Sequence, residues 1–251
     1  MEIVNCIKNK IFWLCVVAFG VVVLLGSVDT IALGIQAISD GMELENGFHG
    51  TLILQALSKD AVTLALPILC ALPYTASFID DVKSGFIKSY LSRTTVSRYI
   101  RGKIGACAVS GGLVLALGLL LAYGISAVAF APMEMALQEG EVAQPLLAEL
   151  LKRVPLFFCS GAFWALLGMT FAALTKSRYM AFASPFIFYY VLIILNERYF
   201  QDFYVLYPKE WLAPGEYWPL GSWGAFLLLA ELVLLMAIAF WAAAKRRIEQ
   251  I

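Results

Sequence analysis

Six apolar stretches, each about as long as a membrane is thick, constrain this chain more than any other feature. A helix of about twenty residues crosses the roughly 30 Å hydrocarbon core of a bilayer. With 61% of its 251 residues hydrophobic and only 14% charged, the chain is not a water-soluble globule. We therefore expect residues 1–251 to form one all-α, polytopic transmembrane domain. The expected spans are approximately 11–33, 61–79, 104–131, 155–175, 179–195 and 223–244.

Lysine and arginine residues are divided unequally between the two sides of this six-span arrangement. The side that holds both termini has thirteen of the eighteen: two before span one, six between spans two and three, two between spans four and five, and three after span six. The opposite side has the other five. Because cytoplasmic loops carry an excess of positive residues, we expect both termini to be cytoplasmic.

The connector between spans two and three has a pattern of its own. Its apolar residues recur at steps of four and one, which places them on one stripe of a helix, with lysine, serine and arginine on the other faces. Thr94 and Thr95 are poor helix formers, so the element should end before them. The pattern predicts a short amphipathic helix from Val82 to Arg93. Its apolar stripe consists of Val82, Phe86, Ile87, Tyr90 and Leu91.

The order of motifs in residues 78–104 resembles the loop between spans two and three of type 2 ABC transporter permeases, the six-helix exporter class. The order is an acidic pair, Lys-Ser-Gly, an apolar-rich turn, Leu-Ser-Arg, Val-Ser-Arg-Tyr and Gly-Lys, with Thr95 in place of the usual proline. In that family the loop carries a coupling helix that docks on a separate ATP-hydrolysing subunit. By this resemblance, the residues expected to couple to the ATPase are Asp81, Gly85, Phe86, Ile87, Tyr90, Leu91 and Arg93.

The resemblance also implies partners and cofactors. Two copies of an ABC ATPase would hold ATP and Mg²⁺, and a second permease, identical or related, would complete the transporter. The chain itself has no Gly-x-x-x-x-Gly-Lys-Ser/Thr loop, so we expect neither ATP hydrolysis nor a cofactor in it. His49 is the only histidine, and Ser-His hydrolase and zinc-protease signatures are missing. We expect His49 to be exposed, with no metal site and no nucleic-acid partner.

Three polar residues in or near the spans are candidates for a role inside the membrane. Asp29 lies at the end of span one, close enough to the outer surface to reach water. Tyr74 lies in span two, where two prolines free carbonyl groups that need polar partners. Glu231 lies about 12 Å down span six from Trp223. Because an ionisable group at the bilayer centre costs about 2.5–3.5 kcal/mol, we expect Glu231 to face protein, as a functional group or as a protonated, hydrogen-bonded glutamate.

Two functions from different classes follow from these features. The first is the permease subunit of an ATP-driven exporter in a bacterial cell membrane, for peptide, drug or lipid substrates, with antimicrobial-peptide export or immunity as an example. Polysaccharide exporters of the family begin with a long amphipathic helix, whereas ten residues precede span one here. The alternative is a non-transporting six-helix binding, sensor or immunity protein. An ATPase that copurifies with the chain would distinguish them.

Overall fold

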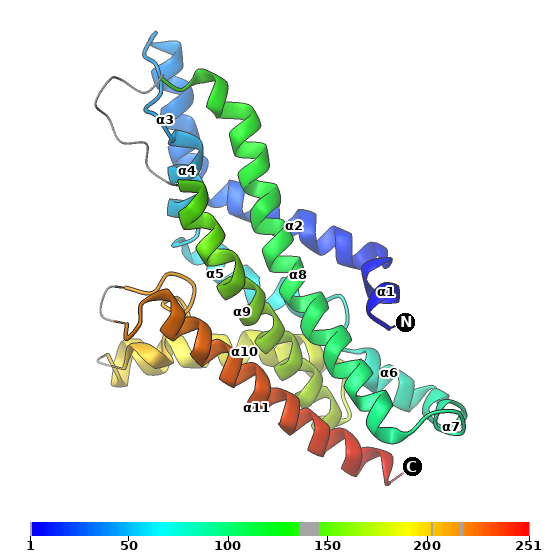
Figure 1. Cartoon of the computed structure of the whole chain (residues 1–251). Coiled ribbons are helices and arrows are strands. Elements are labelled where there is room, and N and C mark those ends of the chain that lie inside the picture. Colours follow the sequence, from blue (N-terminus) through cyan, green and yellow to red (C-terminus); the bar gives the residue numbers. More distant parts are fainter. Residues whose placement is uncertain (1, 136–145, 202, 216–217, 251) are drawn as a thin grey trace.

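The structure, a computed structural model, describes residues 2–135, 146–201, 203–215 and 218–250. Its elements are helical and follow the chain in an elongated bundle (Figure 1). In order they are α1 (Glu2–Ile7), α2 (Lys10–Gly26), α3 (Val28–Ser39), α4 (Phe48–Ala56), α5 (Asp60–Ala71), α6 (Ser77–Lys83), α7 (Phe86–Leu91), α8 (Val96–Phe130), the 3₁₀ turn η1 (Ala131–Met133), α9 (Leu146–Thr175), α10 (Arg178–Tyr199), the 3₁₀ turn η2 (Tyr204–Leu206) and α11 (Ser222–Ile248).

Helix α9 lies at the centre of the bundle, against α8, α10, α11 and α5 (Figure 1). In its most apolar 18-residue window, 83% of the residues are buried. Glycine permits the closest of these contacts. A Cβ added to Gly161 of α9 would lie 2.4 Å from the carbonyl oxygen of Gly111 in α8, which no side chain could tolerate. Small residues thus let these two backbones meet, as they do between helices in membranes.

Four helices are each long and apolar enough to cross a membrane by themselves: α8 with η1, α9, α10 and α11. Two further pairs reach the required length only together, because each is bent. Helices α2 and α3 meet at 60°, and α4 and α5 meet at 71°. Among the described residues the chain therefore has four to six candidate spans.

The first expected span, 11–33, is interrupted at Ser27. This residue leaves helical geometry with φ −104° and ψ 10°. Its buried hydroxyl donates to the carbonyl oxygens of Leu24, at 2.9 Å, and Val23, at 3.4 Å. Serine hydroxyls that bond back to the preceding turn compete with the helix and bend it. The expected span over residues 11–33 is therefore not one straight helix, because α3 continues in a new direction.

The second expected span, 61–79, also differs from the structure. Helix α5 ends at Ala71, and α6 begins at Ser77 after a five-residue turn. Pro73 lies in that turn, and proline has no backbone N–H with which to continue the hydrogen bonds of the helix. Helix α4 precedes α5 and was not predicted, because its nine residues lie in a stretch that reads as a polar connector.

Helix α8 provides a reference line through the molecule, because different parts of the chain meet its two ends. Near its start, Lys103 contacts Glu2 of α1 and Asp81 of α6. Just beyond its last turn, the N–H of Leu44 donates to the carbonyl oxygen of Met133, at 3.3 Å. The 35 residues of α8 extend about 52 Å at 1.5 Å per residue. The chain therefore passes from one end of α8 to the other twice before α8 begins.

Candidate functional site

The connector before α8 consists of two short helices that meet at Gly85. Helix α6 ends at Lys83, and α7 begins at Phe86. Gly85 has φ +74°, in the left-handed region that favours glycine, and a Cβ there would meet nothing within 4 Å. Backbone conformation, and not crowding, therefore explains the glycine. The prediction of one helix from Val82 to Arg93 is wrong, because the chain turns at Gly85.

The apolar stripe of the connector is largely covered by the protein itself. Ile87 is 1% exposed and packs in a cluster with Phe78, Tyr99 and Ile100. Tyr90 and Leu91 are half-buried against the same cluster. Phe86 is 47% exposed, so one residue of the expected stripe is open to a partner. The exposed residues of the connector are Lys83, Ser84, Gly85, Phe86, Lys88, Ser89, Ser92 and Arg93.

A buried lysine fixes the connector to the rest of the bundle. Lys103 of α8 is 4% exposed, and its Nζ lies 2.8 Å from Asp81 Oδ2 and 3.3 Å from Glu2 Oε2. The Tyr99 hydroxyl donates to Asp81 Oδ2 at 2.7 Å, and the Tyr74 hydroxyl donates to Glu2. These five residues, called the Lys103 network below, join α1, α6 and α8 with the turn before α6.

The environment of Lys103 compensates for its burial. An ammonium group taken out of water loses several kcal/mol of solvation, which only close and well-placed partners recover. Lys103 Nζ has two carboxylates, and it also lies 5.2 Å from the ring centroid of Tyr74 and 5.6 Å from that of Tyr99. The side chains of Asp81 and Glu2 keep 21% and 26% exposure, so the site holds two acids that water reaches and one cation that it does not.

This network was not predicted from the sequence, where Lys103 counts among the cations of a water-facing connector. One signal for it exists in the sequence. Tyr99 and Lys103 are four residues apart, so in a helix they share one face, and a lysine stacked beside an aromatic ring can be buried. The other members come from α1 and α6, and helical periodicity does not reveal contacts between elements.

A cavity of about 370 Å³ adjoins the Lys103 network and reaches the connector. Its walls come from α1, α7 and α8 and from the residues beside them. Because Phe86 and Tyr90 of α7 form one wall, any displacement of α7 changes the cavity and the surroundings of Glu2. The lining residues are Glu2, Asn5, Cys6, Asn9, Tyr74, Phe86, Tyr90 and Lys103.

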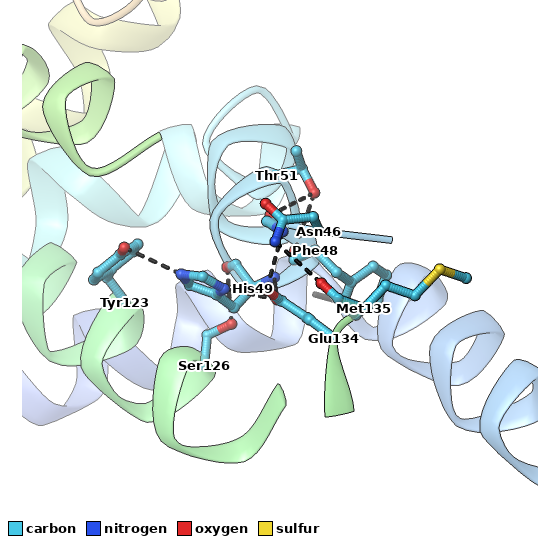
Figure 2. A network of polar contacts seen from close by, with 9 residues as sticks. Asn46, Phe48, His49, Thr51, Tyr123, Ser126, Glu134 and Met135 are labelled. Atoms are coloured by element: carbon cyan, nitrogen blue, oxygen red, sulfur yellow. Dashed lines mark hydrogen bonds and ion pairs between the residues drawn. The ribbon is translucent and has the colours of Figure 1, made fainter. Parts of the chain in front are cut away.

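A second polar network lies at the far end of α8 and is centred on Glu134 (Figure 2). Glu134 Oε1 lies 2.7 Å from His49 Nδ1 and accepts the His49 backbone N–H, also at 2.7 Å. Its Oε2 accepts the N–H of Gly47 at 2.9 Å, and His49 Nε2 lies 3.2 Å from the Tyr123 hydroxyl. His49 is therefore partly buried and paired, and the expectation of a lone exposed histidine is wrong.

Glu134 acts as the N-cap of α4 although it is far away in the sequence. The first N–H groups of a helix lack partners within the helix, and here the carboxylate of another segment accepts two of them. Partial burial alone would raise the pKa of Glu134, but the hydrogen bonds from His49 and Gly47 outweigh it and lower that pKa below its ordinary value. The carboxylate is therefore ionised, and it binds the start of α4 to the end of α8.

The three intramembrane candidates lie in different places. Asp29 is exposed in the first turn of α3, where a carboxylate complements the helix dipole. Tyr74 belongs to the Lys103 network. Glu231 lies on the exposed side of α11 near Leu227 and Leu234, which are 57% and 61% exposed, and it has no hydrogen-bond or ion-pair partner among the described residues.

No described part of this chain encloses Glu231, so the expectation that it faces protein stays a prediction about a partner chain. The sequence did not reveal this exposure, because helix periodicity does not mark which side of α11 meets α9. An exposed carboxylate at this depth is expensive in lipid.

No group of three or more His, Cys, Asp or Glu side chains in the described ranges is arranged to hold a metal ion. No family model matches the chain, and no curated protein or solved structure is similar enough to count as a match. A function is therefore argued from the residues and their geometry.

Proposed function

We propose that this chain is the membrane-spanning permease subunit of an ATP-driven exporter in a bacterial cell membrane. The observation that supports this most is the connector, whose tip at Phe86 is exposed while its base is held through Asp81 and Lys103. A segment that is exposed at one end and held by an ion pair at the other can transmit a displacement, caused by a bound partner, to α1 and α8. Coupling between sites needs this kind of contiguous, packed contact.

Six crossings of the membrane are part of the proposal. Glu2 and Asp81 contact the first turns of α8, whereas Leu44 and His49 contact residues at its far end. If α8 spans the membrane, then residues 2–44 and 49–81 each run from one face to the other. The bent pairs α2–α3 and α4–α5 then count as spans, and the excess of positive residues assigns the connector and both termini to the cytoplasm.

Each proposed partner has a separate role in transport. Two ABC ATPase subunits bind ATP and Mg²⁺ and hydrolyse the nucleotide, and a second permease copy or a related permease completes the pathway. Peptides, drugs or lipids are the proposed substrates. The expected coupling residues fall into two groups: Gly85, Phe86 and Arg93 contact the ATPase, while Asp81, Ile87, Tyr90 and Leu91 hold the connector on the bundle.

The first test is whether an ATPase encoded in the same cell copurifies with the full chain. Phe86→Ala is expected to weaken that association at least thirtyfold, since truncating an interface anchor costs about 2 kcal/mol or more. Phe203→Ala is the matched control. Phe203 is also an exposed phenylalanine, at 60%, but it follows the C-terminal end of α10 and does not belong to the connector. Affinity can be measured by pull-down in detergent with titrated ATPase.

Two results would contradict the proposal. If no ATPase associates with the wild-type chain, the non-transporting alternative replaces the exporter. If the Phe86 and Phe203 variants bind the ATPase equally well, the connector is not the docking element. Lys88→Ala should change the affinity little, because single rim charges contribute little to binding.

A further inference from the structure

A cavity of about 700 Å³ lies between the C-terminal ends of α9 and α11, and its walls differ in character. One wall is apolar and made of small residues, with three alanines from α11. The rim holds four cations against one carboxylate, Glu249, a net charge of +3. The rim cations are Lys176, Lys245, Arg246 and Arg247.

Helix geometry explains how these two walls join. Ala239, Ala242, Ala243 and Arg246 follow one another at steps of three, one and three, so they lie on one face of α11. The apolar groove therefore runs along the last turns of the helix and ends at a guanidinium group. Lys176 stands in the α9–α10 turn with φ +60° and adds a second cation from another element.

One rim residue carries a buried donor for which the described residues offer no acceptor. The Nε–H of Arg247 is buried and has no acceptor among the described residues, although the same side chain reaches Gln250 through Nη1 at 3.5 Å. Buried polar groups in folded proteins almost always have a partner. An acceptor from outside the chain would supply the one that is missing here.

We propose that this cavity binds an anionic phospholipid, with its phosphate on the rim cations and an acyl chain along the alanine wall. Arginine is suited to the phosphate because its planar fork of N–H groups matches two phosphate oxygens. The cavity lies within the size range of ligand sites, about 300–1,000 Å³. Basic pockets between helices on the cytoplasmic side are a recognised type of lipid site.

The apolar wall distinguishes a lipid from a free phosphate ion, which would make no use of it. It also distinguishes a lipid from an acidic protein segment, because Leu174, which belongs to the same wall, is 57% exposed at the end of a membrane-spanning helix. This site needs no ATPase, and of the proposed function it uses only the cytoplasmic location of the C-terminal ends of α9 and α11.

The experiment uses the purified full chain, stripped of lipid in detergent, with phosphatidylglycerol or phosphatidylcholine of identical acyl chains added. Unfolding temperature and native mass spectrometry report binding, because a ligand of the folded state stabilises it by mass action. Phosphatidylglycerol is expected to bind and to raise the unfolding temperature, whereas phosphatidylcholine should not. Arg246→Gln with Arg247→Gln should weaken the affinity at least about tenfold, since charge-assisted bonds are lost.

Two further variants separate the lipid site from general surface charge. Ala242→Phe fills the groove without changing the charge, and it should also weaken phosphatidylglycerol binding about tenfold. Arg98→Gln with Arg101→Gln is the matched control, because it removes two exposed cations near the start of α8, outside the cavity. This control should bind phosphatidylglycerol like the wild type, and all variants should unfold like the wild type without lipid.

Several results would overturn the proposal. Equal loss of affinity in the cavity and control variants would indicate only surface electrostatics. If inorganic phosphate stabilises the chain as much as phosphatidylglycerol and the Ala242 variant keeps that effect, the cavity is a phosphate site. If the arginine variant keeps lipid binding but loses a copurifying protein, the cavity is a protein-docking surface.

Discussion

At the scale of single residues, Lys103 shows how one charge can determine local structure. Two carboxylates from α1 and α6 converge on it, although each of them remains partly exposed. Removal of the ammonium would leave these two acids close together without the cation that they share. Their repulsion would act on α1 and α6, the two helices that carry the acids.

We predict that Lys103→Ala lowers the free energy of unfolding by about 2–3 kcal/mol. Breaking a buried ion pair costs about 3–5 kcal/mol, and the partial exposure of both acids reduces this value. Arg101→Ala is the control, because Arg101 is an exposed cation in the same turn of α8. Chemical unfolding in detergent measures both variants. Indistinguishable stabilities would show that the Lys103 network does not stabilise the fold.

At the scale of elements, α4 depends on Glu134, which lies 85 positions after His49 in the sequence. Its own N-cap position is Gly47, with φ +80°, which has no side chain to cap the helix. Glu134 supplies the missing acceptor. The start of α4 and the end of α8 should therefore lose their structure together when Glu134 is neutralised.

We predict that Glu134→Gln costs about 1–2 kcal/mol near neutral pH, the typical value of a charge-assisted cap. The pKa of Glu134 is lowered in the folded state, so the advantage of the wild type is complete above the ordinary value of 4.5. It disappears as the pH falls through the lowered pKa. Unfolding temperatures of both proteins from about pH 7 to about pH 3 check this.

Two other side chains of the same network stand beside Glu134. His49 contacts it directly, and Tyr123 stands behind His49. Repeating the pH series in the background of His49→Gln isolates the carboxylate. If the stability difference that Glu134→Gln makes stays constant with pH in that background, the carboxylate does not cap α4.

The elements also show what the sequence could reveal. Hydropathy located all four unbroken helices that are long and apolar enough to be spans, because the apolar runs in α8 to α11 leave no alternative to helix. It did not locate the bends at Ser27 and near Pro73, since a bend depends on where a freed carbonyl or hydroxyl finds its partner. Neither polar network could be predicted, because each joins residues from separate elements. Likewise, periodicity identified the apolar stripe of α7 but not that the protein itself buries Ile87.

At the scale of the whole molecule, charge and contacts give the same arrangement independently. Both termini and the connector carry most of the lysine and arginine residues. The same segments meet at one end of α8, through the Lys103 network and through the packing of Ile248 of α11 with the cluster around Ile87. Residues 41–50 and Glu134 meet at the other end (Figure 1).

We predict opposite labelling of Glu43→Cys and Ser89→Cys in intact cells, in a background with all native cysteines replaced by alanine. Both positions are exposed, but Glu43 adjoins the far end of α8 and Ser89 lies in α7 beside its start. A membrane-impermeant maleimide should react with the cysteine at position 43 and reach position 89 only after permeabilisation. Gln201→Cys and Gln250→Cys are the controls, because three and four unbroken helices, respectively, separate them from Ser89. If each bent pair instead enters and leaves the membrane on the same side, positions 43 and 89 will label alike. The molecule then has four spans.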